Sequence, residues 1–201
     1  MEIIREPKVE LIAVTQDAER LIEKAARRCY FGPDFEALPG ETLGEYLRKI
    51  KDRGHLSVFE HASVTFDIQN VSRVFLAQIS RHRIASPSVE SQRYRSQSEF
   101  DIVLPEAYSD EKIGKELLAK VLGFICDGKK LYDELIAHGM LKEDARYILF
   151  NGGTTSMLFT VNFREMMHIL DLRDHPKAQK ETRVVVQEMA RLLHAIYPSI
   201  F

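Results

Sequence analysis

The sequence predicts a mixed α/β protein of the α+β type, with a mostly antiparallel central sheet packed against helices. Segments with strand character and segments with helical spacing occur along the chain, but without the regular alternation of a doubly wound parallel sheet. The chain has 201 residues, of which 45% are hydrophobic and 29% charged, which suits one domain with a substantial core. Because no repeat, low-complexity tract or flexible linker interrupts it, we expect a single domain over residues 1–201.

Four segments are expected to form strands, namely residues 9–14, 62–68, 100–104 and 154–161. The second alternates apolar and polar side chains, as a half-buried strand does, and the fourth is rich in Thr, Phe and Val. By contrast, residues 84–98 are polar and rich in serine, with a proline, so we expect a loop there.

Apolar residues at helical spacing, together with Ser or Thr at starts and Gly after ends, predict the helices. Ser72 is expected to cap the third of them. The expected helices are residues 17–30, 42–52, 73–79, 111–138, 142–149, 164–173 and 176–196.

The composition excludes several classes of protein. The longest apolar runs are far shorter than the ~20 residues that span a bilayer, and the N-terminus lacks the pattern of a signal peptide. Cys29 and Cys126 have no spacing typical of a disulfide framework or a zinc site, so no metal is expected. With a net charge of -2 as well, we expect a cytoplasmic protein that binds neither membrane nor nucleic acid.

Basic residues nevertheless gather in one segment. Residues 73–95 contain five arginines and a single acid, Glu90. Within it, Arg81-His82-Arg83 is followed after seven residues by Ser91 and then by Gln92-Arg93-Tyr94. Arginine forks match phosphate oxygens bidentately, so the cluster suits a nucleotide or a pyrophosphate. Two structural alternatives remain: arginines held in surface ion pairs, and His82 as a hydrogen-bonded structural histidine.

These residues carry a family resemblance. Arg81-His82-Arg83, seven residues and Ser91 resemble the RHR-x7-S signature of flavin-dependent thymidylate synthases, and the Arg93-Tyr94 continuation extends it. Further segments resemble the family in the same order along nearly the whole chain. They include Gly54-His55 with Phe59-Glu60-His61, Thr160-Val161-Asn162, Leu170-Asp171-Leu172-Arg173 and Ala178-Gln179.

The resemblance implies a reaction in which dUMP becomes dTMP. Methylenetetrahydrofolate would donate the one-carbon unit, and FAD reduced by NADPH would supply the hydride. No cysteine attacks the pyrimidine in this family, and neither cysteine here has an evident activating neighbour, so both are expected to be structural. Ser91 has no identifiable His–Asp activator and is expected to hydrogen-bond the substrate. The family also implies a homotetramer with shared active sites.

The resemblance also implies roles for individual residues. Arg173 would face the uracil as the catalytic residue and stabilise negative charge as N3 ionises, although a helix-capping arginine is the structural alternative. The residues that would hold dUMP are Gln78, Arg81, Ser91, Gln92, Arg93, Arg146 and Arg173. The residues that would line the FAD site are His55, Ser57, Arg81, His82, Arg83, Val89, Asn162 and His168.

Three departures from the family pattern concern these contacts. Val89 stands where the family commonly has Glu or Gln, so a contact to flavin or nucleotide is either lost or supplied by another residue such as Glu90. His168 stands where Asn is common. Residues 174–177 replace a stretch that often contains a His before Ala-Gln. Two other functions stay open: a related flavin enzyme acting at C5 of another pyrimidine nucleotide or leaving a different one-carbon product, and a nucleic-acid-binding domain using the arginine cluster.

Overall fold

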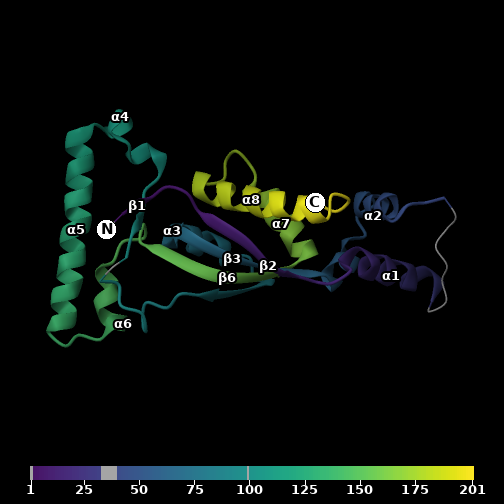
Figure 1. The fold of residues 1–201 in the computed structure, drawn as a ribbon, viewed down its shortest axis with the longest axis horizontal. Helices are drawn as coiled ribbons and strands as arrows, with labels where there is room; N and C mark the ends of the chain where they lie inside the picture. The colour runs from purple at the N-terminus through teal and green to yellow at the C-terminus, as the bar shows by residue number, and fades with distance from the viewer. Residues whose placement is uncertain (1, 33–39, 99) are drawn as a thin grey trace. The chain divides into compact units, whose positions relative to one another are not determined.

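A computed structural model describes residues 2–32, 40–98 and 100–201 (Figure 1). Contacts divide the chain into two compact units, each assembled from segments that are distant in sequence. Unit 1 comprises Met1–Lys8, Ile68–Ile79 and Ser88–Met157, and unit 2 comprises Val9–Asp67, Ser80–Pro87 and Leu158–Phe201. The expectation of one domain over the whole chain stays a prediction.

A four-stranded antiparallel sheet confirms the predicted fold class. Its strands, in spatial order, are β2 (Lys8–Val14), β3 (Ser63–Ser72), β6 (Thr154–Asn162) and β4 (Ala85–Val89). The predicted alternation holds, because Val64, Phe66 and Ile68 of β3 are all buried. On β6 the same period of two buries Met157, Phe159 and Val161.

Strand β4 corrects the prediction of a loop over residues 84–98. Its sequence, Ala-Ser-Pro-Ser-Val, has neither the apolar alternation nor the β-branched content of a typical strand. The strand lies at the edge of the sheet, where Pro87 is tolerated because one side of the strand needs no ladder partner for its missing N–H. The remaining residues, 90–98, are turns and irregular structure, as expected.

The helices of unit 2 follow the predictions closely. Its elements are α1 (Ala18–Phe31), α2 (Leu43–Asp52), the 3-10 helix η1 (Leu56–His61), α7 (Phe163–Arg173) and α8 (Lys180–Ile196). Helix α1 packs on α2 and η1, and α7 packs on η1 and α8. Helix α8 begins four residues later than predicted, where the side chain of Gln179 accepts a hydrogen bond from Thr182 N at 3.2 Å.

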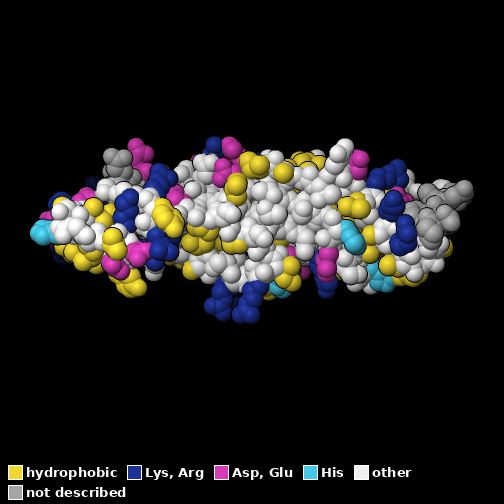
Figure 2. All heavy atoms as spheres, turned by 90° about the horizontal axis from the view of Figure 1, so that it is seen from below, with side chains coloured by type: hydrophobic (Ala, Val, Ile, Leu, Met, Phe, Trp, Pro, Cys, Tyr) yellow, Lys and Arg dark blue, Asp and Glu magenta, His cyan; other side chains and the backbone are white. Residues whose placement is uncertain are grey.

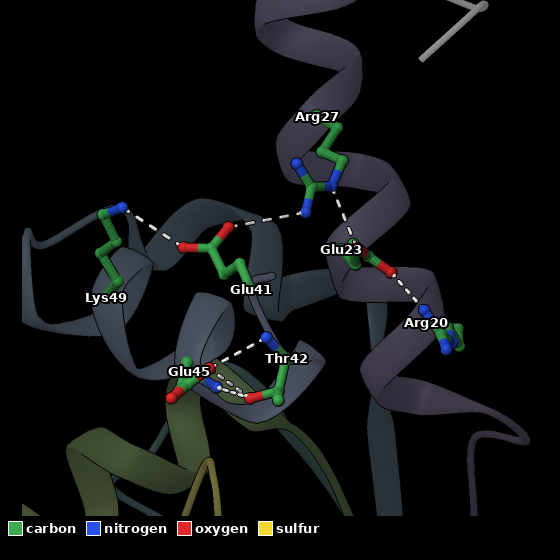
Figure 3. A network of polar contacts seen from close by, with 7 residues as sticks. All are labelled: Arg20, Glu23, Arg27, Glu41, Thr42, Glu45 and Lys49. Carbon is green, nitrogen blue, oxygen red and sulfur yellow. Dashed lines mark hydrogen bonds and ion pairs between the residues drawn. The ribbon is translucent and has the colours of Figure 1, made fainter. Parts of the chain in front are cut away.

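Buried charges join α1 to the start of α2 (Figure 3). Arg27 is 2% exposed, and its Nε lies 3.0 Å from Glu23 Oε1 while its Nη2 lies 3.9 Å from Glu41 Oε2. Its guanidinium also stands 4.0 Å from the ring centroid of Tyr46. At the start of α2, Thr42 and Glu45 form a capping box, which satisfies backbone N–H groups of the first turn.

Unit 1 contains shorter strands and the longest helix. The two-stranded pair β1 (Ile3–Ile4) and β5 (Ile102–Val103) is parallel, and β5 is shorter than the strand predicted over residues 100–104. Helix α3 (Arg73–Ile79) begins as predicted, with Phe75 N donating to Ser72 Oγ at 3.1 Å. The other elements are η2 (Glu106–Tyr108), α4 (Asp110–Ile113), α5 (Lys115–Ala137), α6 (Lys142–Ala145) and η3 (Arg146–Ile148).

Two predicted helices of unit 1 are corrected. The helix expected over residues 111–138 is interrupted at Gly114, whose φ of 80° lies in the left-handed region and separates α4 from α5. The helix expected over residues 142–149 is one turn of α helix followed by a 3-10 turn. Among the described residues, no helix combines the length and apolar composition needed to cross a membrane.

Candidate active site

The Arg81-His82-Arg83 motif lines a cavity of about 580 Å³ in unit 2. The motif lies on the segment between α3 and β4. The rest of the wall comes from α7, where Glu165, His168 and Leu172 recur at intervals of three and four residues and therefore share one helix face. The complete lining is Arg81, His82, Arg83, Ile84, Glu165, His168, Leu172 and Arg173.

The two arginines of the motif form no ion pair within the described chain. Arg81 and Arg83 are both exposed, and neither forms an ion pair with any residue that the structure describes. The alternative of surface ion pairs therefore fails for these two positions within the described chain. Two guanidinium forks at one cavity favour an anionic ligand such as a phosphate.

His82 is the buried member of the motif, only 6% exposed. Its Nδ1 lies 3.1 Å from Glu165 Oε1, and its Nε2 accepts a hydrogen bond from Arg173 Nε at 3.0 Å. Burial lowers the pKa of His82, and the charge of Arg173 lowers it further, against the opposing effect of the hydrogen bond to Glu165. The ring is therefore neutral at neutral pH.

Arg173 is the last residue of α7 and is half-buried. Two interpretations of Arg173 followed from the sequence, a catalytic cation and a cap at the end of a helix. The position at the end of α7 suits a cation near the helix dipole, while the hydrogen bond to His82 turns the side chain towards the motif and the cavity. This geometry is compatible with both interpretations, the helix cap and the cation at the cavity.

His168 also lines a second cavity in unit 2, of about 410 Å³, to which Asn162 contributes. His168 is exposed and stands edge-on to His82, with ring centroids 5.9 Å apart. Asn162 caps α7, because its Oδ1 accepts from Glu165 N at 2.8 Å. That hydrogen bond gives Asn162 a structural role that the family resemblance alone did not imply.

His55 and Ser57 belong to the same unit but line neither of these two cavities. His55 precedes η1, and its Nδ1 lies 3.1 Å from the hydroxyl of Tyr30, whose ring stacks on it. Ser57 is exposed within η1. Leu56, which stands between these two expected flavin contacts in the chain, lines the smaller cavity together with His168.

Several residues expected to hold dUMP lie in unit 1, and two of them contact Glu143. Arg93 Nε forms an ion pair with the Glu143 carboxylate at 2.6 Å, and Arg146 Nε donates to the Glu143 backbone oxygen at 3.1 Å. Ser91 Oγ accepts from Arg93 N at 3.2 Å, and the side chain of Gln92 donates to that of Gln97 at 3.4 Å. Gln78, in the last turn of α3, belongs to unit 1 as well.

At the position of the family's common Glu or Gln, Val89 ends strand β4 and is half-buried. The neighbouring carboxylate, Glu90, is already engaged, since it pairs with Arg95 at 3.0 Å and accepts from Ser156 Oγ at 3.3 Å. A ligand contact from Glu90 would therefore compete with two existing partners.

Sequence reasoning missed Glu165. This carboxylate is 7% exposed and belongs to a helix segment whose neighbours Met166 and Met167 are buried. The available signal was an acid inside an apolar stretch, three residues before His168 on a helix, because a buried carboxylate requires a partner.

Comparisons with known proteins agree with the motif. The family model described as thymidylate synthase complementing protein matches residues 10–199. A flavin-dependent thymidylate synthase from Geobacter sulfurreducens is 36% identical over 200 residues, covering 96% of this chain and 85% of the relative. Another from Nitratidesulfovibrio vulgaris is 35% identical, covering 98% of this chain and 86% of that protein.

A solved structure shares the fold. The crystal structure of the UMP/dUMP methylase PolB from Streptomyces cacaoi, bound with 5-Br dUMP, has a TM-score of 0.88 and covers 100% of this chain and 95% of that one. At 24% sequence identity this likeness supports the architecture. The family match over most of the chain and the identity of 35–36% to these two relatives together show that the chain belongs to the flavin-dependent thymidylate synthase family.

Proposed function

We propose that this protein is a flavin-dependent thymidylate synthase that converts dUMP to dTMP. In this proposal methylenetetrahydrofolate donates the one-carbon unit and NADPH reduces the enzyme's FAD. The observation that carries the proposal is the cavity lined by Arg81, His82, Arg83 and Arg173 in a chain of this family.

The residues of the cavity fit a flavin nucleotide. Arg81 and Arg83, which have no acidic partner among the described residues, suit the pyrophosphate. The exposed ring of His168 offers polar and aromatic surface, and the ring of His82, whose nitrogens are engaged, offers aromatic surface alone. Asn162 would join them from the adjoining cavity, and the family resemblance adds His55, Ser57 and Val89. When bound, the flavin supplies hydride chemistry that no side chain can supply.

For dUMP, we propose the set Gln78, Arg81, Ser91, Gln92, Arg93, Arg146 and Arg173. Arg93 already binds a carboxylate, Glu143, through its Nε, and a phosphate dianion would compete for the same edge with a larger charge. The Ser91 hydroxyl would act as a hydrogen-bonding group and not as a nucleophile.

Arg173 is the proposed catalytic residue. A fixed guanidinium beside the uracil stabilises negative charge as N3 loses its proton, and the electron-rich ring is then more nucleophilic at C5. No cysteine is needed for this activation. Cys29 and Cys126 are both exposed, and neither lines the cavities that hold His168.

We further propose that the two compact units act as one functional domain, because a single family model spans residues 10–199. We also propose a homotetramer with shared active sites. The family resemblance supports both proposals.

Two other functions make different predictions. An enzyme of this family that prefers UMP would methylate the ribonucleotide faster than dUMP. A nucleic-acid-binding domain requires a broad basic surface, whereas on the face drawn in Figure 2 basic side chains stand in small groups among acidic and apolar ones. Within the arginine-rich segment, Arg93 and Arg95 are paired with Glu143 and Glu90, which leaves less free positive charge.

The test is product formation by the purified protein with FAD, NADPH, methylenetetrahydrofolate and either dUMP or UMP. We expect dTMP by mass spectrometry, dependent on all four components, and a flavin spectrum that dUMP perturbs. Arg81→Ala with Arg83→Ala should lose flavin binding, whereas Arg191→Ala, in an exposed ion pair on α8, should not. A protein that binds neither FAD nor dUMP would contradict the proposal, and faster turnover of UMP would replace the substrate.

A further inference from the structure

A chain of hydrogen bonds links a buried carboxylate to the proposed catalytic arginine. It runs from Glu165 through His82 to Arg173, with donor–acceptor distances of 3.1 and 3.0 Å. All three residues belong to unit 2, and two of them are on α7. The first two are almost fully buried, so water competes little for their hydrogen bonds.

The chemistry of arginine determines where the proton of His82 lies. An arginine Nε–H donates and never accepts, so the Nε2 atom of His82 must be the acceptor. The single proton of the neutral ring is then on Nδ1, where it points at the Glu165 carboxylate. With the opposite tautomer, two N–H groups would face each other at Arg173.

We infer that Glu165 is a positioning residue for thymidylate synthesis, acting through the tautomer of His82 to orient the guanidinium of Arg173. The inference rests on the proposed function for its kinetic consequence. A carboxylate accepts at both oxygens and never donates through them while ionised, so it holds the Nδ1–H tautomer. That tautomer presents a lone pair to Arg173 Nε and fixes one edge of the planar guanidinium.

A metal ion is the other occupant that this cluster suggests. Donor atoms of His82, Glu165 and His168 lie within 4.8 Å of one another. However, both nitrogens of His82 are engaged, one as a protonated donor and one as the acceptor for Arg173. Three arginine side chains line the same cavity, and their charge opposes a second cation.

Two substitutions at Glu165 separate its functions. Glu165→Leu removes the acceptor at nearly constant size, so His82 Nδ1–H loses its partner and the tautomer that opposes Arg173 becomes competitive. Glu165→Gln keeps a carbonyl oxygen that accepts from Nδ1–H, but removes the charge. We expect kcat to fall about tenfold to a hundredfold in Glu165→Leu, and less in Glu165→Gln, with the KM for dUMP changed little.

The decisive kinetic measurement is a double-mutant cycle with Arg173. If Glu165 acts through Arg173, then Glu165→Leu lowers kcat no further in an Arg173→Ala background. Additive losses would mean a merely structural role and would overturn the inference. Glu188→Leu on α8 is the matched control, because it removes a carboxylate from the exposed pair with Arg191 and should leave kcat unchanged.

A second measurement does not depend on catalysis. In protein labelled with ¹⁵N-histidine, the signals of His82, assigned by their loss in His82→Gln, should show the Nδ1–H tautomer at pH 7.5. This tautomer should persist in Glu165→Gln and diminish in Glu165→Leu. An Nε2–H tautomer in the unsubstituted protein, or stoichiometric zinc binding that shifts both ring nitrogens, would overturn the inference.

If Glu165→Leu does not fold, the double-mutant cycle with Glu165→Gln and the tautomer of the unsubstituted protein still test the inference. Absence of dTMP with the expected tautomer would contradict the proposed function and leave the hydrogen-bonded chain established.

Discussion

At the scale of single residues, Arg173 joins a fixed charge to a defined orientation. Its charge alone is reproduced by lysine, but its Nε–H hydrogen bond to His82 is not. We expect Arg173→Ala to lower kcat by about 10²- to 10³-fold, the loss typical for a group that stabilises developing negative charge. The kcat of Arg173→Lys should lie between that of Arg173→Ala and that of the unsubstituted protein. Steady-state kinetics with dUMP would measure both variants.

The kcat of Arg173→Lys separates the effect of the charge from that of the orientation. If lysine restored full activity, the charge of Arg173 would matter and its orientation would not. Arg191→Lys on the exposed surface of α8 is the control for a loss that is unrelated to the site.

His82 gives the folded protein a pH dependence with a definite sign. Burial, and next the charge of Arg173, lower its folded-state pKa below the ordinary 6.5, and the groups facing the ring are Glu165, Arg173 and His168. Between that lowered pKa and 6.5 the unfolded chain binds more protons at this position than the folded chain does. The free energy of unfolding should therefore decrease as the pH falls through this window.

Urea unfolding at pH 7.5 and pH 5.5 would measure this effect, with His82→Gln beside the unsubstituted protein. Because the chain has seven histidines, the informative quantity is the difference between the two pH dependences. We expect a smaller loss of stability on acidification in His82→Gln. Equal losses in both proteins would show that His82 does not titrate in this window.

The sequence could predict the motif residues of the site but not their connections. The resemblance identified Arg81, His82 and Arg83 by the spacing of the signature, and Arg173 by the Leu170-Asp171-Leu172-Arg173 segment. It could not identify Glu165, because the partner of His82 lies 83 residues further along and only tertiary structure brings them together. For the same reason it could not show that Arg93 forms an ion pair with Glu143.

At the scale of elements, sequence patterns predicted helix starts correctly where a capping side chain satisfies the first backbone N–H groups. Helix α2 begins after Thr42 because a capping box satisfies its first N–H groups, and Ser72 does the same for α3. They failed for β4, whose Ser and Pro residues form a strand only because β6 supplies a partner. They also failed at Gly114, where a helical pattern continues through a residue with a left-handed backbone.

The buried charges between α1 and α2 offer a test at this scale. Arg27→Met would leave Glu23, which is nearly buried, without its closest buried counter-charge. Removing one partner of a buried pair typically costs about 3–5 kcal/mol, and we expect the lower end because Arg20 also contacts Glu23 at 3.0 Å. Urea unfolding monitored by circular dichroism would measure the loss.

The double variant Arg27→Met with Glu23→Leu is the informative comparison. Because it removes both charges, it should recover much of the lost stability. If the double variant were as unstable as Arg27→Met, the packing of the arginine side chain against Tyr46, and not its charge, would explain the loss.

At the scale of the whole molecule, no feature of the sequence predicts the two compact units. Their segments interleave along the chain, so no linker or shift in composition separates them.

Association of subunits is the property at this scale that the structure helps to test. Leu117, Phe124 and Leu131 of α5 follow at intervals of seven residues and are all exposed, Phe124 by 70%.

Side chains seven residues apart lie within about 20° of one another around a helix, so these three form one apolar stripe. Exposed apolar side chains aligned in this way are typical of a surface covered by another subunit. We expect the unsubstituted protein to have about four times its 23.2 kDa chain mass by light scattering, and Phe124→Glu to be smaller. Cys126→Glu places the same charge on the same helix but off the stripe, because two residues turn the helix by about 200°, and it should keep the larger mass. If both variants kept the mass of the unsubstituted protein, the stripe on α5 would not be a subunit interface, whereas a monomeric unsubstituted protein would refute the tetramer itself.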